Sequence, residues 1–142
     1  MIDQTISDVM SRGVRTVTSG VTASDVAQVL AEDNTGSVIV TDPETNDILG
    51  IVTESDIMHQ VAVDADISSV PVGSFMSTSI ITVAGEESIH TAASLMKEHS
   101  VRRLPVVDDG ELVGVLTTTD LAHYLPRLRR TILRSRGDLG GQ

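Results

Sequence analysis

The sequence contains no cysteine, and Phe75 and Tyr124 are its only aromatic residues. Without cysteine the chain can form no disulfide, no zinc-thiolate site and no thiol nucleophile. Its hydrophobic content of 40% is nevertheless sufficient for a core, and that core must be aliphatic. A length of 142 residues suits one ordinary domain or two small units that are too thin to be stable apart.

Long apolar runs are also missing. No stretch approaches the roughly 18 apolar residues of a membrane span. The first residues, Met-Ile-Asp-Gln-Thr, lack the basic region and long apolar run of a signal peptide. We therefore expect a soluble, cytoplasmic protein with no membrane partner.

Basic residues are scarce and unevenly distributed. Lys97 is the only lysine, Asp outnumbers Glu 13 to 7, and the net charge is -10. This halophile-like composition resembles that of proteins from high-salt cytoplasms. Residues 1–121 hold 5 basic and 19 acidic residues, whereas residues 122–142 hold five Arg and only Asp138. Because an acidic surface repels a phosphate backbone, we do not expect nucleic acid as a partner.

The main organisational signal is an internal duplication. Identical residues align at an offset of 66, and two extra residues near 45–47 then change the offset to 64. A single insertion that falls in a turn is typical of a duplicated unit. The matched pairs are Met10-Ser11 with Met76-Ser77, Thr16-Val17 with Thr82-Val83, Ala27 with Ala93, Val40 with Val106, Asp42 with Asp108, Gly50 with Gly114, Thr53 with Thr117, and Asp56 with Asp120.

Each copy predicts the element order β-α-β-β-α, which gives an α/β protein whose copies complete each other's core. Thr22 and Ser88 are the expected N-caps of the first helices, and Asp109-Gly110 is a strong hairpin signal. The second helices should begin near Asp56 and Asp120. The strands are predicted at 14–17, 38–40, 48–52, 80–83, 104–107 and 112–116, and the helix faces at Val26, Ala27 and Leu30 and at Ala92, Ala93 and Met96. The predicted division is copy one at 1–63, a linker at 64–73, copy two at 74–125 and a basic C-terminal segment at 126–142.

The best-repeated motif is Gly-Ile-Val-Thr-Glu-Ser-Asp at 50–56 and Gly-Val-Leu-Thr-Thr-Thr-Asp at 114–120. Here the chain resembles the CBS (cystathionine beta-synthase) domain family, whose third strand ends in Gly-h-h-Thr/Ser-x-x-Asp. The resemblance extends to about residue 125. It implies two tandem CBS repeats, related by a pseudo-twofold axis, that form one module with a ligand cleft between them and often a homodimer.

In that family the Thr contacts phosphate or ribose, the Asp binds the ribose hydroxyls, and the adenine lies between apolar residues of the first two strands. The resemblance therefore implies the following ligand-binding residues: Thr53, Asp56, Thr117 and Asp120 from the motif, and Thr16, Val17, Thr82, Val83, Ile39, Leu104 and Pro105 from the strands.

Elementary chemistry supports this interpretation and also offers a plainer one. An ionised Asp can accept both hydroxyls of a vicinal diol, and a strand-to-helix junction directs N–H groups and the positive end of the helix dipole at an anion. Thr-x-x-Asp before an apolar helix is also a capping box, in which both side chains serve the helix alone. The two roles are compatible.

A second motif, Val101-Arg102-Arg103-Leu104-Pro105-Val106, distinguishes the copies. It is similar to the His-Arg-Leu-Pro-Val stretch in the gamma subunit of the AMP-activated protein kinase, whose basic pair faces the ligand phosphates. Guanidinium groups suit phosphate because they donate two parallel hydrogen bonds. The alternative is a surface pair that bridges nearby carboxylates. Copy one has Gly36-Ser37 at this place, and Arg15 is the cation nearest in sequence that could substitute.

The sequence predicts no catalytic residue, no metal site and no required cofactor. His59, His90, His99 and His123 lack metal-ligand spacing, and no P-loop or nucleophile elbow is present.

The final segment places Leu121, Leu125, Leu128 and Ile132 at helical spacing among arginines, with Pro126 as a kink. It is predicted either to complete a core or dimer interface, or to dock an acidic partner.

The leading hypothesis is a regulatory module that binds an adenosine-containing ligand and transmits the bound state to an unidentified protein partner. AMP, ADP and ATP are the expected ligands, with S-adenosylmethionine or methylthioadenosine as the alternative. A ligand-free scaffold module is the second hypothesis. An enzyme is disfavoured, since the chain lacks the length and the catalytic cysteine of the barrel in IMP dehydrogenase, an enzyme that CBS pairs accompany.

Overall fold

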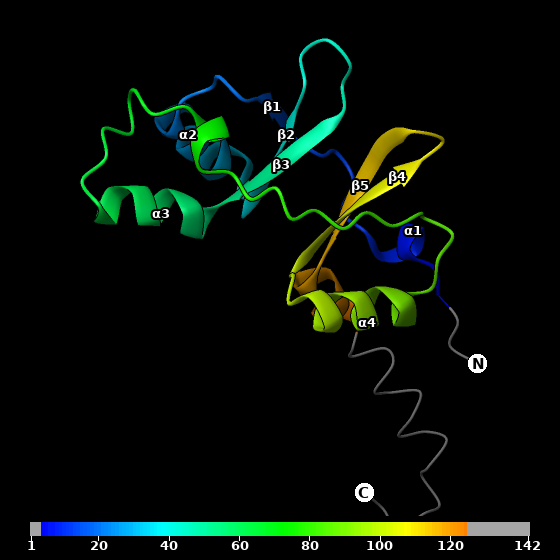
Figure 1. Ribbon diagram of the computed structural model, residues 1–142. Helices are drawn as coiled ribbons and strands as arrows, with labels where there is room; N and C mark the ends of the chain where they lie inside the picture. Colours follow the sequence, from blue (N-terminus) through cyan, green and yellow to red (C-terminus); the bar gives the residue numbers. More distant parts are fainter. Residues whose placement is uncertain (1–3, 125–142) are drawn as a thin grey trace, which may run out of the picture. The chain divides into compact units, whose positions relative to one another are not determined.

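The computed structural model describes residues 4–124, which fold as two compact units (Figure 1). The central unit is Val14–Ile80, one continuous segment. The split unit combines Met1–Gly13 with the chain from Ile81 onward. Residues 4–13 therefore fold with the second copy of the repeat, not with the first.

The central unit is a three-stranded sheet with two helices. In chain order it contains β1 (Thr16–Thr18), α2 (Ala23–Asp33), β2 (Ser37–Thr41), β3 (Ile48–Thr53), α3 (Glu54–Ala62) and the 3-10 turn η1 (Val72–Ser74). The strand order is β1-β2-β3, with β1 parallel to β2 and β2 antiparallel to β3. The aliphatic core consists of Val26, Leu30, Val38, Val40, Val52 and Val72.

The predicted N-cap starts α2, and a left-handed residue ends it. The Thr22 side chain accepts a hydrogen bond from the Asp25 N–H, and Asn34 closes the helix at φ 51°. Val26 and Leu30 are buried one turn apart, whereas Ala27 is half-buried. The apolar spacing therefore identified the buried face correctly.

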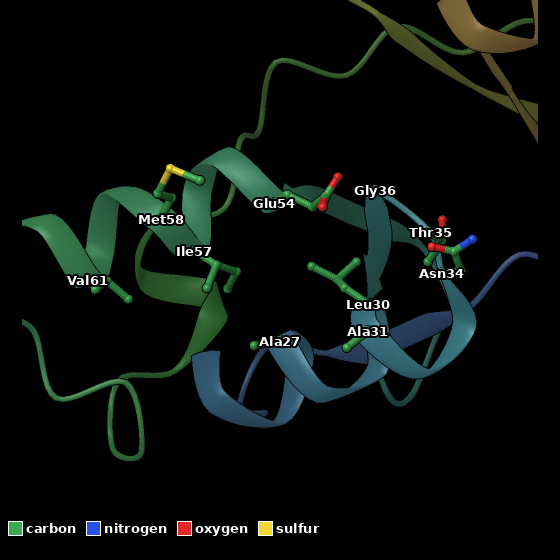
Figure 2. A pocket seen from close by; sticks show the side chains of 10 residues that line it. All are labelled: Ala27, Leu30, Ala31, Asn34, Thr35, Gly36, Glu54, Ile57, Met58 and Val61. Atoms are coloured by element: carbon green, nitrogen blue, oxygen red, sulfur yellow. The ribbon is translucent and has the colours of Figure 1, made fainter.

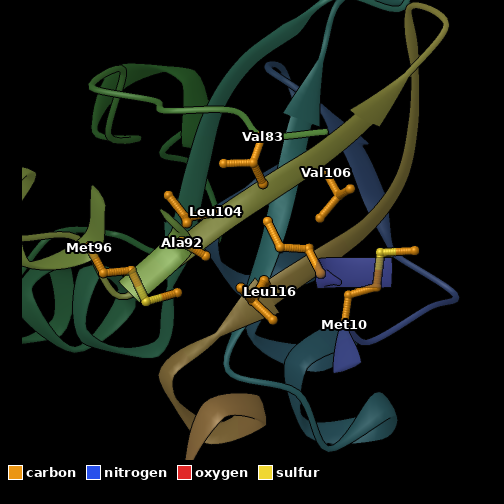
Figure 3. Close-up of a cluster of buried hydrophobic side chains, with 8 residues drawn as sticks. Met10, Val83, Ala92, Met96, Leu104, Val106 and Leu116 are labelled. Carbon is orange, nitrogen blue, oxygen red and sulfur yellow. The ribbon is translucent and has the colours of Figure 1, made fainter. Parts of the chain in front are cut away.

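The split unit contains α1 (Ile6–Val9), α4 (Ile89–His99), β4 (Arg103–Asp108) and β5 (Glu111–Thr117), followed by helical residues 118–124. Strands β4 and β5 are antiparallel, and the Asp109-Gly110 turn has positive φ at both residues, as the hairpin signal predicts. Ser88 caps α4 as expected. Figure 3 shows the core cluster, which consists of Ile6, Met10, Val83, Ala92, Met96, Leu104, Val106 and Leu116.

Two expectations for this unit were wrong. Ala93 is exposed, and Ile89 lies on the buried face of α4 with Ala92 and Met96. The strand expected at 80–83 is reduced to a single parallel bridge between Val83 and Val106. The cause is visible in the other copy, where the Ile39 N–H donates to the Arg15 carbonyl. Pro105 occupies the matching place, and since proline has no N–H, the equivalent ladder bond cannot form.

The repeated Gly of the motif provides space for a methionine from a distant segment. A Cβ at Gly114 would lie 2.6 Å from the Met10 sulfur, and one at Gly50 would lie 2.6 Å from the Met76 sulfur. The residue after each methionine then forms an antiparallel bridge to the neighbouring strand, Ser11 with Val115 and Ser77 with Ile51. The repeated Met-Ser pair is thus a docking element for the repeated Gly-containing strand.

Residues 64–73, expected as a linker, are part of the central unit and pack against its other segments. The Ala23 N–H donates to the Val70 carbonyl at 2.9 Å, and the Val72 N–H donates to the Val21 carbonyl at 2.8 Å. Val72 is fully buried in the core. The boundaries 1–63 and 74–125 describe the sequence repeats, and the packing units cross them.

Candidate functional site

Both predicted Thr-x-x-Asp motifs lie at strand-to-helix junctions and form capping boxes. In the central unit the Thr53 N–H donates to Asp56 Oδ2 at 2.8 Å, and the Asp56 N–H donates to Thr53 Oγ1 at 3.3 Å. In the split unit the Thr117 N–H donates to Asp120 Oδ2 at 2.9 Å, and the Asp120 N–H donates to Thr117 Oγ1 at 3.0 Å. The structural role of the motif is therefore real in both copies, and each box fixes the direction of one carboxylate.

The two carboxylates differ in their second oxygen. Asp120 Oδ1 accepts a hydrogen bond from the Ser11 hydroxyl at 2.8 Å. Within residues 4–124, Asp56 Oδ1 has no corresponding bond from Ser77, the matching serine. Asp120 is thus held at both oxygens, whereas Asp56 presents one oxygen that is available to a ligand hydroxyl.

Arg103 stands directly across the sheet from Thr117. The two residues are register partners at the ends of β4 and β5, where opposite Cβ atoms lie about 5 Å apart. The structure therefore brings Arg103 from one motif beside Thr117 and Asp120 from the other. Arg103 is half-buried, whereas Arg102 is exposed.

In the central unit the same register places an uncharged residue opposite the threonine of the capping box. Ser37 pairs with Thr53 at the place where Arg103 pairs with Thr117. Arg15, the candidate substitute, is bound elsewhere, because its guanidinium lies 2.9 Å from Asp33 Oδ2. One junction therefore carries a guanidinium beside the capping box, and the other carries a hydroxyl.

The strand residues implied by the resemblance divide into two groups. Thr16 and Thr82 are exposed, and their contact with a ligand stays a prediction. The apolar ones lie inside: Val83 and Leu104 belong to the core of the split unit, and Val17 packs against the core of the central unit. Ile39 and Pro105 are also fully buried, between neighbours whose side chains point to the opposite sheet face. Packing in a core accounts for Val17, Val83 and Leu104, and contact of any of the five apolar residues with a purine stays a prediction.

Ser11 and Ser37 contribute to the junctions and were not selected from the sequence. A signal for Ser11 existed in the duplicated Met-Ser pair, which aligned without an assigned role. Ser37 was identified as the residue of copy one at the place of Arg103, but its pairing with Thr53 was not predicted.

The chemistry available at these junctions is that of binding. They contain carboxylates, threonine hydroxyls, helix N–H groups and, in one copy, a guanidinium. In residues 4–124 no cluster of three or more His, Asp or Glu side chains could hold a metal ion. No helix in the same range is long and apolar enough to cross a membrane.

Comparison with known proteins agrees with this architecture. The family model described as "CBS domain" matches twice, at residues 6–63 and 72–127. The chain is 32% identical over 117 residues to the CBS domain-containing protein YhcV of Bacillus subtilis, covering 82% of each chain. It is also 32% identical over 123 residues to Hypoxic response protein 1 of Mycobacterium tuberculosis, covering 86% of this chain and 85% of that protein.

A solved structure shows the same fold. The CBS domain protein PAE2072 from Pyrobaculum aerophilum, complexed with AMP, superposes with a TM-score of 0.76 at 31% identity. The match covers 82% of this chain and 89% of that one. The chain therefore belongs to the CBS-domain family and contains a tandem pair of CBS domains. Such pairs are generally regulatory modules rather than catalytic domains.

Proposed function

We propose that this CBS pair is a sensor that binds an adenosine-containing ligand at its strand-to-helix junctions and transmits the bound state to a protein partner. The observation that carries the proposal is the placement of Arg103 opposite Thr117, beside the Asp120 capping box. A guanidinium, a hydroxyl, a carboxylate and helix N–H groups at one junction match the ribose and phosphate of a nucleotide.

The two junctions are proposed to differ in preference. The Arg103 junction suits a phosphorylated ligand such as AMP, ADP or ATP, because guanidinium pairs with phosphate oxygens bidentately. The Asp56 junction has Ser37 in place of the arginine and one available carboxylate oxygen, which suits the ribose diol of a less charged ligand. S-adenosylmethionine or methylthioadenosine is the alternative ligand class, and the second junction is where we expect it. PAE2072, which is 31% identical to this chain, was solved in complex with AMP. This supports AMP as the first ligand to test.

Thermal unfolding with added ligand tests the proposal. A ligand that binds only the native state stabilises it by mass action, by about 2.7 kcal/mol at 100 times Kd. AMP, ADP, ATP, S-adenosylmethionine and methylthioadenosine should be titrated separately, in low-salt and high-salt buffer. We expect a concentration-dependent rise in Tm with at least one adenine nucleotide. A folded protein whose Tm responds to none of the five compounds would exclude the sensor function.

A ligand-free interaction module is the second candidate, and one observation favours it. Both oxygens of Asp120 already accept hydrogen bonds from the protein, so a ribose at this junction must share or displace the Ser11 hydroxyl. The titration separates the two candidates, since a scaffold predicts no response to any ligand.

A further inference from the structure

Ser11 already occupies one oxygen of the carboxylate that a ligand would use in the split unit. Its hydroxyl donates to Asp120 Oδ1 at 2.8 Å, while Oδ2 of the same carboxylate accepts the Thr117 N–H at 2.9 Å. A carboxylate binds the hydroxyls of a ribose through these same acceptor oxygens. The Ser11 hydroxyl therefore stands where a ribose hydroxyl would donate.

The backbone of Ser11 is fixed independently of this side-chain bond. The Ser11 N–H donates to the Val115 carbonyl, and the Val115 N–H donates to the Ser11 carbonyl, both at 3.0 Å. The preceding residue, Met10, is buried in the core of the split unit (Figure 3). Loss of the bond to Asp120 would therefore leave the segment in place and change only the direction of one side chain.

The matching serine of the central unit has the same backbone pairing but not the same side-chain bond. The Ser77 N–H donates to the Ile51 carbonyl at 2.9 Å, and the Ile51 N–H donates to the Ser77 carbonyl at 3.0 Å. In the part of the chain that the structure describes, no hydrogen bond joins the Ser77 hydroxyl to Asp56. The shared backbone arrangement thus accommodates the serine hydroxyl both on and off the carboxylate.

The helix starts of the two junctions are alike as well. The Glu54 N–H donates to the Gly36 carbonyl at 3.0 Å, and both residues line the groove between α2 and α3 that Figure 2 shows. In the split unit the Thr118 N–H donates to the Arg102 carbonyl, also at 3.0 Å. The Ser11–Asp120 bond is therefore an addition in one copy and not a requirement of the repeated fold.

The Ser11 hydroxyl can leave the carboxylate without opening the core. Ser11 is exposed and Asp120 is half-buried. The freed hydroxyl would bond to water, so it would not incur the penalty of a buried group without a partner. A ligand hydroxyl that took its place would keep the number of hydrogen bonds to the carboxylate unchanged.

We propose that Ser11 is an internal competitor for Asp120: a ribose hydroxyl of the ligand displaces the Ser11 hydroxyl from Oδ1, and the lost bond raises the Kd at this junction. The inference rests on the adenosine-binding function proposed above and names a residue that sets the affinity of that site. The competition acts on the hydroxyls of the ribose and not on the adenine or the phosphate.

The competition predicts how ligand binding and stability are linked. Ser11→Ala should destabilise the free protein but not the complex, because in the complex the bond is already broken. Urea denaturation of the parent and of Ser11→Ala is measured without AMP and with AMP far above its Kd. We expect the difference in unfolding midpoint to disappear in the presence of AMP. By the same cycle, Ser11→Ala should lower the Kd for AMP about fivefold, which corresponds to about 1 kcal/mol.

One variant and one ligand serve as matched controls. Ser77→Ala, with the same backbone pairing and exposure as Ser11→Ala, should leave the Kd for AMP unchanged. The analogue 2′,3′-dideoxy-AMP has no ribose hydroxyl and cannot replace the serine as a donor. It should therefore bind the parent and Ser11→Ala with equal affinity.

Three outcomes would contradict the inference, and they are distinguishable. A stability difference that persists with AMP far above its Kd would mean that Ser11 stays bound to Asp120 in the complex. An equal gain in affinity for AMP and for its dideoxy analogue would mean that the serine acts by its size and not as a donor. If AMP changes the stability of neither protein, the proposed function fails and the competition fails with it.

Discussion

The hydroxyl of Ser11 donates a hydrogen bond of 2.8 Å to Oδ1 of Asp120, although the two residues are 109 positions apart in the chain. This bond connects the first segment of the split unit to the last helix described in it. It also makes the two junctions unequal, since Ser77 does not engage Asp56 in this way among the described residues.

Replacing Ser11 by alanine should therefore cost more stability than the matched change at Ser77. A hydrogen bond to a charged acceptor contributes about 1.5–3 kcal/mol when it is shielded, and this exposed bond should contribute about 1 kcal/mol. Urea denaturation of Ser11→Ala and Ser77→Ala measures the difference. Equal losses in the free energy of unfolding would mean that the Ser11 bond contributes nothing to stability.

Arg103→Ala should weaken AMP binding and leave adenosine binding unchanged. Loss of a charged hydrogen-bond donor to phosphate costs about 1.5–3 kcal/mol, which corresponds to a tenfold or greater rise in Kd. Calorimetric titration of both ligands measures it, and the exposed Arg102→Ala variant is the control. If adenosine and AMP affinities fall together, Arg103 has a structural role at the junction.

Gly114→Ala should destabilise the protein because the added methyl group has no space. Its carbon would lie 2.6 Å from the flexible Met10 side chain and 2.9 Å from the Ser11 carbonyl oxygen, which belongs to the backbone. Forcing a group into a packed site costs about 1–3 kcal/mol. Gly20→Ala is the matched control, since nothing lies within 4 Å of a Cβ there. Similar unfolding midpoints for the two variants would contradict the close packing of Met10 on β5.

Asp42 should make stability depend on pH in the acid range. Backbone hydrogen bonds from Thr45 and Glu44, at 3.1 Å and 2.8 Å, hold the pKa of this carboxyl below its ordinary value of 3.8. A carboxyl whose pKa is lower in the folded state stabilises the fold above its unfolded pKa, and this contribution is lost as the pH falls through the folded pKa.

The Asp42→Asn variant should accordingly show a weaker loss of stability below pH 4 than the parent protein. Titration of the Asp42 carboxyl by NMR gives the pKa directly. A value at or above that of an unstructured peptide would contradict the role of the two backbone bonds.

Much of the fold could be predicted from the sequence because local chemistry and packing agree. The caps at Thr22 and Ser88, the Asp109-Gly110 turn and the paired junctions all follow from short-range rules. The strand at 80–83 could not be predicted correctly, because its loss depends on a missing N–H at Pro105, more than 20 residues away. The packing of residues 4–13 with copy two likewise depends on tertiary contacts, which the periodicity of the sequence does not report.

The sequence predicted which residues lie at the two junctions, but not how buried they are or which hydrogen bonds they make. Thr53, Asp56, Thr117 and Asp120 lie where the motif places them, and the cross-strand register adds Arg103. The burial of Leu104 and Val83 in a core, and the hydrogen bond from Ser11, depend on segments distant in sequence. The sequence alone therefore indicates which chemical groups are present at the site. The structure shows which of their atoms already make hydrogen bonds within the protein.

The division of the split unit between the two ends of the chain has a consequence for biosynthesis. Residues 4–13 leave the ribosome about 100 residues ahead of Val115 and Asp120, their partners. At about 5–20 residues per second the delay is roughly 5–20 s. The central unit is complete well before that time and can fold first. The early segment, with Ile6 and Met10 destined for the core, therefore has no complete core to join until β5 and the helix after it have been made.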